Sequence, residues 1–362
     1  MNRSIHILIY ILLASVYAAN NIWGCTSAII SGKANPEGRT LLWKHRDTGH
    51  EHNFVARVSP TGHSLGYVAL FNGGDSLLNE AWIGMNEAGF AIMNTASYNL
   101  APDTAAYKDR EGYIMSLALK RCRTLIDFEH LLDSLPRPLG VQANFGAIDA
   151  SGAGAYYETD DYRYVKYDIA DDSTGVLIRT NFSYSGPESG GMGFIRHGNA
   201  RTLLEPYIST GQVTPEVLTE VLSRSFYHSI RMNDVMEDTV RLVPDRDFIP
   251  RYSTSASVVI ESALSCETPY KSIMWTMMGY PPCSSVMPVT LFGIPDPLRP
   301  IDNYRTCKVS DWMYSLRHDS LFRTIDNVRY IDLDIVRSMN DNCRKHSANA
   351  YRMGRRLRTD YR

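Results

Sequence analysis

Short apolar runs separated by turn residues fill two stretches, 25–100 and 141–183, and they constrain the fold more than any other feature of the chain. Residues 81–85 and 90–94, for example, flank a glycine-containing turn at 86–89, a pattern that predicts a β-hairpin. Residues 111–135 instead carry apolar side chains at helical spacing until Pro136 stops them. Strand groups separated by helices indicate sheets covered by helices.

The second half of the chain continues this mixture. Pro215 stands at the start of a second predicted helix over 215–227. Residues 251–295 contain further β-branched runs, which predict later strands. Residues 320–362 look helical and end in a basic stretch, which we interpret as a solvated terminal helix or tail.

The N-terminus predicts export. Arg3 precedes about fifteen largely apolar residues, 5–19, a length that suits a signal-peptide core and is short for a membrane span. Ala18 and Ala19 offer a small-residue cleavage site. The alternative is a single N-terminal membrane anchor. We expect an exported protein, periplasmic or secreted, with residues 1–24 forming a signal peptide and a short pro-segment.

Cys25 follows this segment directly after Gly24. It could be an ordinary strand cysteine, a lipidated cysteine, or a nucleophile that becomes the first residue of the chain. Trp23 is too bulky for a lipidation motif. As the first residue, Cys25 would carry its own base, because an α-amine with a pKa near ~7.7–8.0 is partly neutral at pH 7 and can take the thiol proton.

Charge and motif content argue against several other functions. Lys plus Arg number 37 and Asp plus Glu 39, which gives no electrostatic case for nucleic-acid binding. The sequence holds no metal-ligand spacing, phosphate loop or dinucleotide fingerprint, so we expect neither a metal nor another cofactor. His45 and His50 are expected at the surface. The remaining five cysteines could pair, but sequence alone does not give their connectivity.

Several motifs together resemble the N-terminal-nucleophile (Ntn) hydrolases of the linear-amide C–N hydrolase type, across most of the chain after residue 24. This group includes choloylglycine hydrolases, penicillin V acylases and acyl-coenzyme A:6-aminopenicillanic acid acyltransferases. The motifs that carry the resemblance are Gly24-Cys25-Thr26, Asp47, the segment 84–89, Asn94, the segments 144–145 and 149–152, and 180–182.

The resemblance implies an α+β fold, the four-layer αββα sandwich, formed by a catalytic domain over 25–362 with the basic helical tail at its end. It implies that Cys25 attacks linear amides through a thioester and removes any remnant before it by attacking the Gly24 carbonyl. Asp47 would orient the Cys25 amine, and two adjacent antiparallel strands would bring the two residues together.

Three further residues complete the candidate catalytic set. Asn94, at the end of a strand, is the best candidate for an oxyanion-hole donor. Asn181 matches the family's second asparagine, and Arg196 matches a family arginine, although Arg201 lies close enough to compete. Lys44 stands where choloylglycine hydrolases have an arginine, and Arg46 could substitute for it if the strand continues.

We expect a small-molecule substrate, a linear N-acyl amide with an apolar acyl group, because the presumed pocket segments are rich in apolar residues. These residues are Trp82, Met85, Phe90, Met93, Phe145 and Tyr184. An acyltransferase, a bile salt hydrolase or a dipeptidase on the same scaffold are the enzymatic alternatives, and a lipid-anchored binding protein is the non-enzymatic one. The sequence leaves homo-oligomerisation open.

Overall fold

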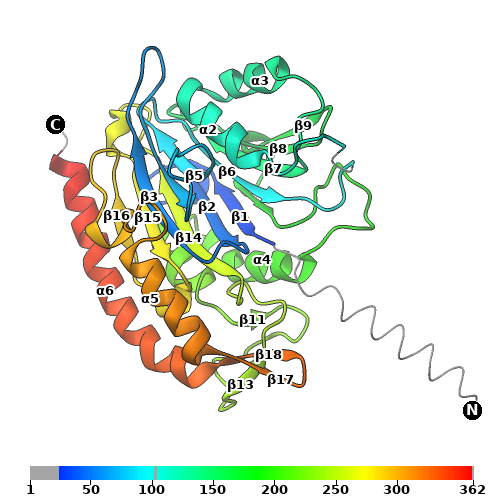
Figure 1. Ribbon diagram of the computed structural model, residues 1–362, viewed down its shortest axis with the longest axis vertical. Coiled ribbons are helices and arrows are strands. Elements are labelled where there is room, and N and C mark those ends of the chain that lie inside the picture. The colour runs from blue at the N-terminus through cyan, green and yellow to red at the C-terminus, as the bar shows by residue number, and fades with distance from the viewer. Residues whose placement is uncertain (1–23, 102–103, 361–362) are drawn as a thin grey trace, which may run out of the picture.

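A computed structural model describes residues 24–101 and 104–360 (Figure 1). The predicted signal peptide and its cleavage site therefore lie outside the described residues. Two antiparallel sheets form the centre of the molecule. The strands of the first half of the chain are β1 (Thr26–Ile30), β2 (Leu41–Asp47), β3 (Asn53–Val58), β4 (Tyr67–Asn72), β5 (Ala81–Asn86), β6 (Ala91–Ala96), β7 (Ala143–Ile148), β8 (Gly154–Thr159), β9 (Tyr164–Asp168) and β10 (Val176–Arg179).

Strands from the second half complete one of the sheets. The six-stranded sheet has the order β10-β1-β2-β14-β15-β16, and the seven-stranded sheet runs from β3 to β9 in sequence order. The later strands are β14 (Thr254–Glu261), β15 (Ile273–Met278) and β16 (Met287–Val289). A small two-stranded sheet joins β11 (Tyr227–His228) to β12 (Asn233–Asp234). In a three-stranded sheet, β18 (Val328–Asp332) lies between β13 (Leu242–Pro244) and β17 (Phe322–Ile325).

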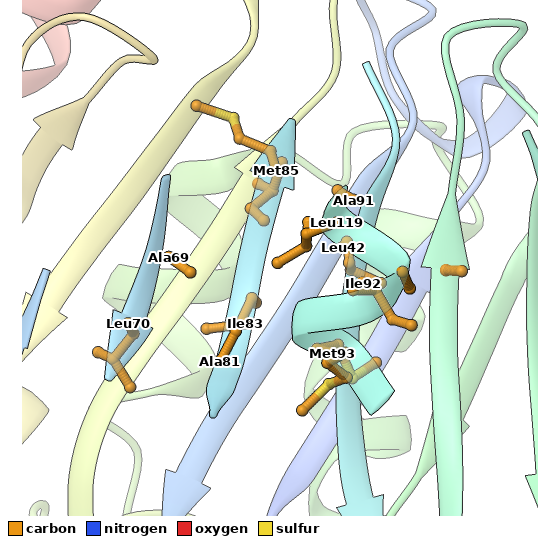
Figure 2. Close-up of a cluster of buried hydrophobic side chains, with 14 of the residues drawn as sticks. Leu42, Ala69, Leu70, Ala81, Ile83, Met85, Ala91, Ile92, Met93 and Leu119 are labelled. Atoms are coloured by element: carbon orange, nitrogen blue, oxygen red, sulfur yellow. The ribbon is translucent and has the colours of Figure 1, made fainter. Parts of the chain in front are cut away.

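The two sheets stack face to face with helices on both outer sides. One apolar core joins Ile29 and Leu42 of the six-stranded sheet to the seven-stranded sheet and its helices α2 (Glu111–Arg121) and α3 (Leu125–Ser134). Figure 2 shows Leu42 of β2 and Leu119 of α2 among side chains of β4, β5 and β6. Close contact is possible because Gly84 leaves room for Leu119, whose methyl carbon would lie 2.9 Å from a Cβ there.

A second core lies on the other side of the six-stranded sheet. It packs Trp43 and Trp275 against α4 (Phe194–Ile208), the short π-helical segment Val217–Leu222, and α6 (Leu333–Asp360). Helix α5 (Lys308–Leu316) lies beside the end of the sandwich (Figure 1). The order of layers is thus helix, sheet, sheet, helix, which confirms the predicted α+β, four-layer αββα fold.

Three predicted elements differ in detail. The helix expected over 111–135 is two helices, because Asn86 Nδ2 donates to the carbonyls of Leu119 and Cys122 and Thr124 caps α3. The helix expected over 215–227 ends at Leu222. Residues 322–332 are two strands, so helix begins only at Leu333 and then packs on the sheet.

Candidate active site

The register of β1 and β2 brings Cys25 beside Asp47. Thr26 pairs with His45 in this antiparallel ladder, so the residues just before Thr26 lie opposite the end of β2. The Cys25 Sγ donates to the backbone carbonyl of Asp47 over 3.7 Å. Both residues are buried. The structure therefore places this pair as the sequence predicted.

The Asp47 carboxylate is held by two residues from the far end of the chain. Thr254 Oγ1 donates to Asp47 Oδ1 over 2.7 Å, and Arg251 pairs with Asp47 Oδ2 through both Nε, at 3.2 Å, and a terminal nitrogen. Burial acts to lower the pKa of Arg251, but the Asp47 carboxylate outweighs it and the pKa is raised. Neither partner was predicted, because both lie over 200 residues from Asp47 in sequence.

His45 extends this network and was wrongly expected at the surface. Its side chain is fully buried, because β2 continues through it to Asp47. The Thr254 hydroxyl gives its proton to Asp47, so at 3.2 Å it accepts from His45 Nε2. Burial lowers the pKa of His45 to about 4, which keeps the ring neutral at neutral pH.

Lys44 and Arg46 lie on one face of β2, as strand alternation predicts for a continuous strand. Lys44 Nζ donates to Trp82 O over 2.8 Å and to Asn94 Oδ1 over 2.7 Å. The last backbone pairing between β5 and β6 at this end joins Ile83 to Met93. The Lys44 ammonium group therefore lies between Trp82 and Asn94, where the next pairing would be. Burial lowers the pKa of Lys44 to about 7.

Arg46 is also buried, but its hydrogen bonds go elsewhere. Its guanidinium donates to Asn53 Oδ1 and Asn72 Oδ1, each over 2.6 Å, and to Ser255 Oγ over 2.9 Å. These contacts tie β2 to β3, β4 and β14. Lys44, and not Arg46, is therefore the cation that contacts Asn94.

The contact with Lys44 fixes the orientation of the Asn94 side chain. When Lys44 is protonated it can only donate, and the atom that faces it is the amide oxygen, Oδ1. The amide nitrogen, a donor, then points away from Lys44. In the described part of the chain, no hydrogen bond to Asn94 Nδ2 is found. The side chain is thus arranged to donate, as an oxyanion-hole residue must.

Asn181 and Arg196 lie against the peptide that precedes Cys25. Arg196 donates to Cys25 O and to Asn181 Oδ1, both over 2.7 Å. A Cβ on Gly24 would lie 2.3 Å from Asn181 Oδ1 and 2.7 Å from an Arg196 nitrogen. Arg201 instead pairs with Glu205 on the exposed side of α4, so Arg196 is the arginine at this site.

Most of the apolar residues expected in the pocket are core residues. Met85, Phe90, Met93 and Phe145 are fully buried in the core of the seven-stranded sheet. Trp82 is half-buried beside Lys44 and Arg46. Tyr184 is 50% exposed, and together with Phe182, Phe194 and His197 it forms an aromatic cluster next to Asn181.

The described residues also bear on metal sites, membrane-spanning helices and disulfides. Residues 24–101 and 104–360 contain no group of three or more side chains suited to hold a metal ion. No helix in this part of the chain is both long enough and apolar enough to cross a bilayer. All six cysteines are free thiols.

Comparison with protein-family models gave no match, and comparison with curated proteins gave none either. Solved structures with a similar fold include an orthologue of N-acylethanolamine-hydrolysing acid amidase from Caenorhabditis elegans, 14% identical, covering 65% of this chain and 92% of its own, with a TM-score of 0.41. A penicillin V acylase from Agrobacterium tumefaciens is 16% identical; the match covers 74% of this chain and 86% of the acylase, with a TM-score of 0.43. A variant of conjugated bile acid hydrolase from Clostridium perfringens is 10% identical; the match covers 75% of this chain and 95% of the hydrolase, with a TM-score of 0.44.

Proposed function

We propose that this protein is an exported Ntn-type cysteine hydrolase that cleaves linear N-acyl amides through a thioester on Cys25. The observation that carries the proposal is the convergence of buried polar groups on Cys25, at its thiol and at the two peptide carbonyls on either side of it. Arg251 contacts the carbonyl of Gly24, Arg196 contacts the carbonyl of Cys25, and Asp47 lies beside the thiol. An ordinary strand cysteine does not require such surroundings.

The proposed roles follow from the donors and acceptors at the site. With residues 1–24 removed, the Cys25 amine takes the thiol proton and later protonates the leaving nitrogen. Asp47, held by Arg251 and Thr254, accepts from this amine and orients it. Asn94 donates to the developing oxyanion. Arg196 fixes Asn181 and the Cys25 backbone.

The start of the mature chain tests the proposal most directly. We expect intact mass and N-terminal sequencing of the exported protein to find a free amine on Cys25. Active protein that starts stably at Ala19 or Asn20, or that carries a lipid on Cys25, would contradict the mechanism. The lipid outcome would favour the anchored binding protein instead.

The thiol is tested by substitution. Cys25→Ala should abolish amide hydrolysis, and Cys25→Ser should leave little, because an alcohol is a much weaker nucleophile at neutral pH. Cys266, which is exposed, provides a matched control, and Cys266→Ala should keep full activity. Full activity in Cys25→Ala would refute the proposal.

Asp47 has a separate test. Asp47→Asn should lower kcat and slow removal of the residues before Cys25, because the amine loses its orienting carboxylate and Arg251 loses its ion-pair partner. Both effects should be small in Asp75→Asn, which changes a carboxylate at the β4–β5 turn. Near-parental rates in Asp47→Asn would mean that the assigned role is wrong.

An apolar acyl group remains the proposed substrate class. Tyr184 and Phe194 are each 50% exposed and pack on Phe182, the residue after Asn181, a placement that suits contact with a hydrocarbon chain. Lys44 in place of the family arginine makes conjugated bile salts a secondary candidate. A panel of N-acyl amino acids, N-acylethanolamines, penicillin V and conjugated bile salts tests this. Hydrolysis of short free peptides alone would favour a dipeptidase.

An acyltransferase on the same scaffold is the main enzymatic alternative. There an amine, and not water, would resolve the thioester on Cys25. Product analysis with and without added amine separates the two activities, because only the transferase forms a new amide at the expense of free acid.

A further inference from the structure

We propose that Arg251 is a catalytic residue for removal of the leader, in which it stabilises the oxyanion that forms when Cys25 attacks the Gly24 carbonyl. This inference rests on the proposed function, in which Cys25 must be freed from residues 1–24. A terminal nitrogen of Arg251 donates to Gly24 O over 2.7 Å. Arg251 thus contacts the carbonyl oxygen of the peptide bond that is to be cleaved.

The surroundings hold this contact in place from two sides. The guanidinium of Arg251 is anchored by its ion pair with the buried Asp47 carboxylate, and only 18% of its side chain is exposed. Gly24 is held from the opposite direction, because its α-carbon packs so closely on Asn181 and Arg196 that a side chain would overlap them. The carbonyl oxygen is therefore presented to a positioned cation before any reaction begins.

Two other side-chain donors lie at the site, and neither bonds to Gly24 O. Arg196 donates to the carbonyl of Cys25, which lies on the far side of the scissile bond, and to Asn181. Asn94 binds Lys44 through its oxygen, and among the described residues its nitrogen makes no hydrogen bond to Gly24 O. Within residues 24–101 and 104–360, Arg251 is the side chain whose hydrogen bond to Gly24 O is found.

The chemistry balances without an added reagent other than water. The Cys25 Sγ forms a bond to the Gly24 carbonyl carbon through a five-membered ring, and negative charge collects on Gly24 O, where the guanidinium stabilises it. The C–N bond then breaks, and the thiol proton ends on the released Cys25 amine. Water hydrolyses the thioester, giving a carboxylate on Gly24 and restoring the thiol.

The experiment follows leader removal in the full chain. Cell-free translation without membranes excludes signal peptidase, so intact mass over time reports self-cleavage alone. Arg251→Gln should slow the appearance of Cys25-start protein by about 10²-fold or more, the effect of losing one oxyanion donor. Arg201→Gln, a surface arginine of α4, should cleave at the parental rate.

A second variant covers loss of folding, because Arg251→Gln leaves the buried Asp47 without its cation. Arg251→Lys keeps the charge, but a single ammonium group replaces the planar fork that spans Asp47 and Gly24 O, so cleavage should slow at least tenfold. Circular dichroism and thermal unfolding identify the folded variants. Cleavage within twofold of parental in a folded Arg251→Gln, or in Arg251→Lys, would overturn the inference.

Failure of the proposed function gives a different result. In that case the parental chain would not be cleaved, or Cys25→Ala would be cleaved as fast as the parent. Cleavage that depends on Cys25 but not on Arg251 would leave the proposed function intact and remove only this role.

Discussion

The Asp47 carboxylate shows how individual residues build the site. It accepts from Thr254, which in turn accepts from His45 and from the backbone N–H of Arg251. The spacing of Cys25 and Asp47 was predictable, since both lie on neighbouring strands joined by a short connection. The proximity of Thr254 and Arg251 to Asp47 was not predictable, because only the pairing of β14 with β2 brings these residues near that carboxylate. His45 was expected at the surface, but β2 extends through it to Asp47 and buries it.

At the residue scale, Asn94 has a measurable role. Asn94→Ala should lower kcat by about 10²-fold with a smaller change in KM, because the amide acts mainly on the developing oxyanion. Steady-state kinetics on the best substrate of the panel gives both constants. Asn79→Ala, at an exposed turn, serves as control. An Asn94→Ala enzyme with near-parental kcat would assign the oxyanion to another donor.

His45 should make stability depend on pH. Burial lowers its pKa to about 4, below the ordinary value of 6.5, so the unfolded chain binds this proton first as pH falls. The folded state therefore loses on the order of 2–3 kcal/mol between pH 6.5 and 4. Thermal unfolding at pH 7.5, 6 and 5 should show a smaller decline in His45→Gln than in the parent. The exposed His63→Gln should decline like the parent; parallel curves for all three proteins would contradict this.

At the scale of elements, β2 carries three buried basic side chains, Lys44, His45 and Arg46, into the sandwich. Sequence pattern predicted the β5–β6 hairpin, because the turn residues and apolar runs are local. It did not predict that the pairing of β5 with β6 would end at Ile83 and Met93, or that Lys44 would bond to Trp82 O just beyond this end. The β17–β18 hairpin was missed although Asp326 and Asn327, both at positive φ, are suited to its tight turn.

Lys44 gives the second pH prediction. Its folded pKa of about 7 lies below the ordinary 10.5, so between these values the unfolded state binds more protons and stability rises with pH. Lys44→Met removes this contribution, and its stability relative to the parent should fall between pH 7 and 9. Chemical unfolding at the two pH values measures it. Lys33→Met, on an exposed side chain, should show no such trend. A constant difference for Lys44→Met would refute the prediction.

At the scale of the whole molecule, the four layers explain why distant segments share one site. Local patterns predicted strand groups separated by helices, and the family resemblance implied the αββα order of the layers. The packing of α6 could not, because a basic sequence such as its C-terminal half is typical of a solvated helix. In the structure α6 lies on the six-stranded sheet, with Tyr351 against Trp275 and Arg358 paired with Glu261.

Gly354 tests that packing. A Cβ there would lie 2.4 Å from a Trp275 ring carbon, an overlap that should cost Gly354→Ala about 1–3 kcal/mol of unfolding free energy. Helix propensity favours alanine by about 1 kcal/mol, so the net loss should be about 0–2 kcal/mol. Asn349→Ala, on the exposed side of α6, should be neutral or slightly stabilising. Denaturant unfolding compares them, and a stabilised Gly354→Ala would show that α6 does not lie this close to the sheet.

The contact between Arg251 and Gly24 O also orders events in time during synthesis. Its two residues are 227 positions apart, so a ribosome adding about 5–20 residues per second needs roughly ten to forty seconds to supply the second after the first. Until then β2 lacks its neighbour β14 and the Gly24–Cys25 bond lacks its cation. If Cys25 removes the leader as proposed, a nascent chain would keep the leader intact while a translocation machinery can still read it.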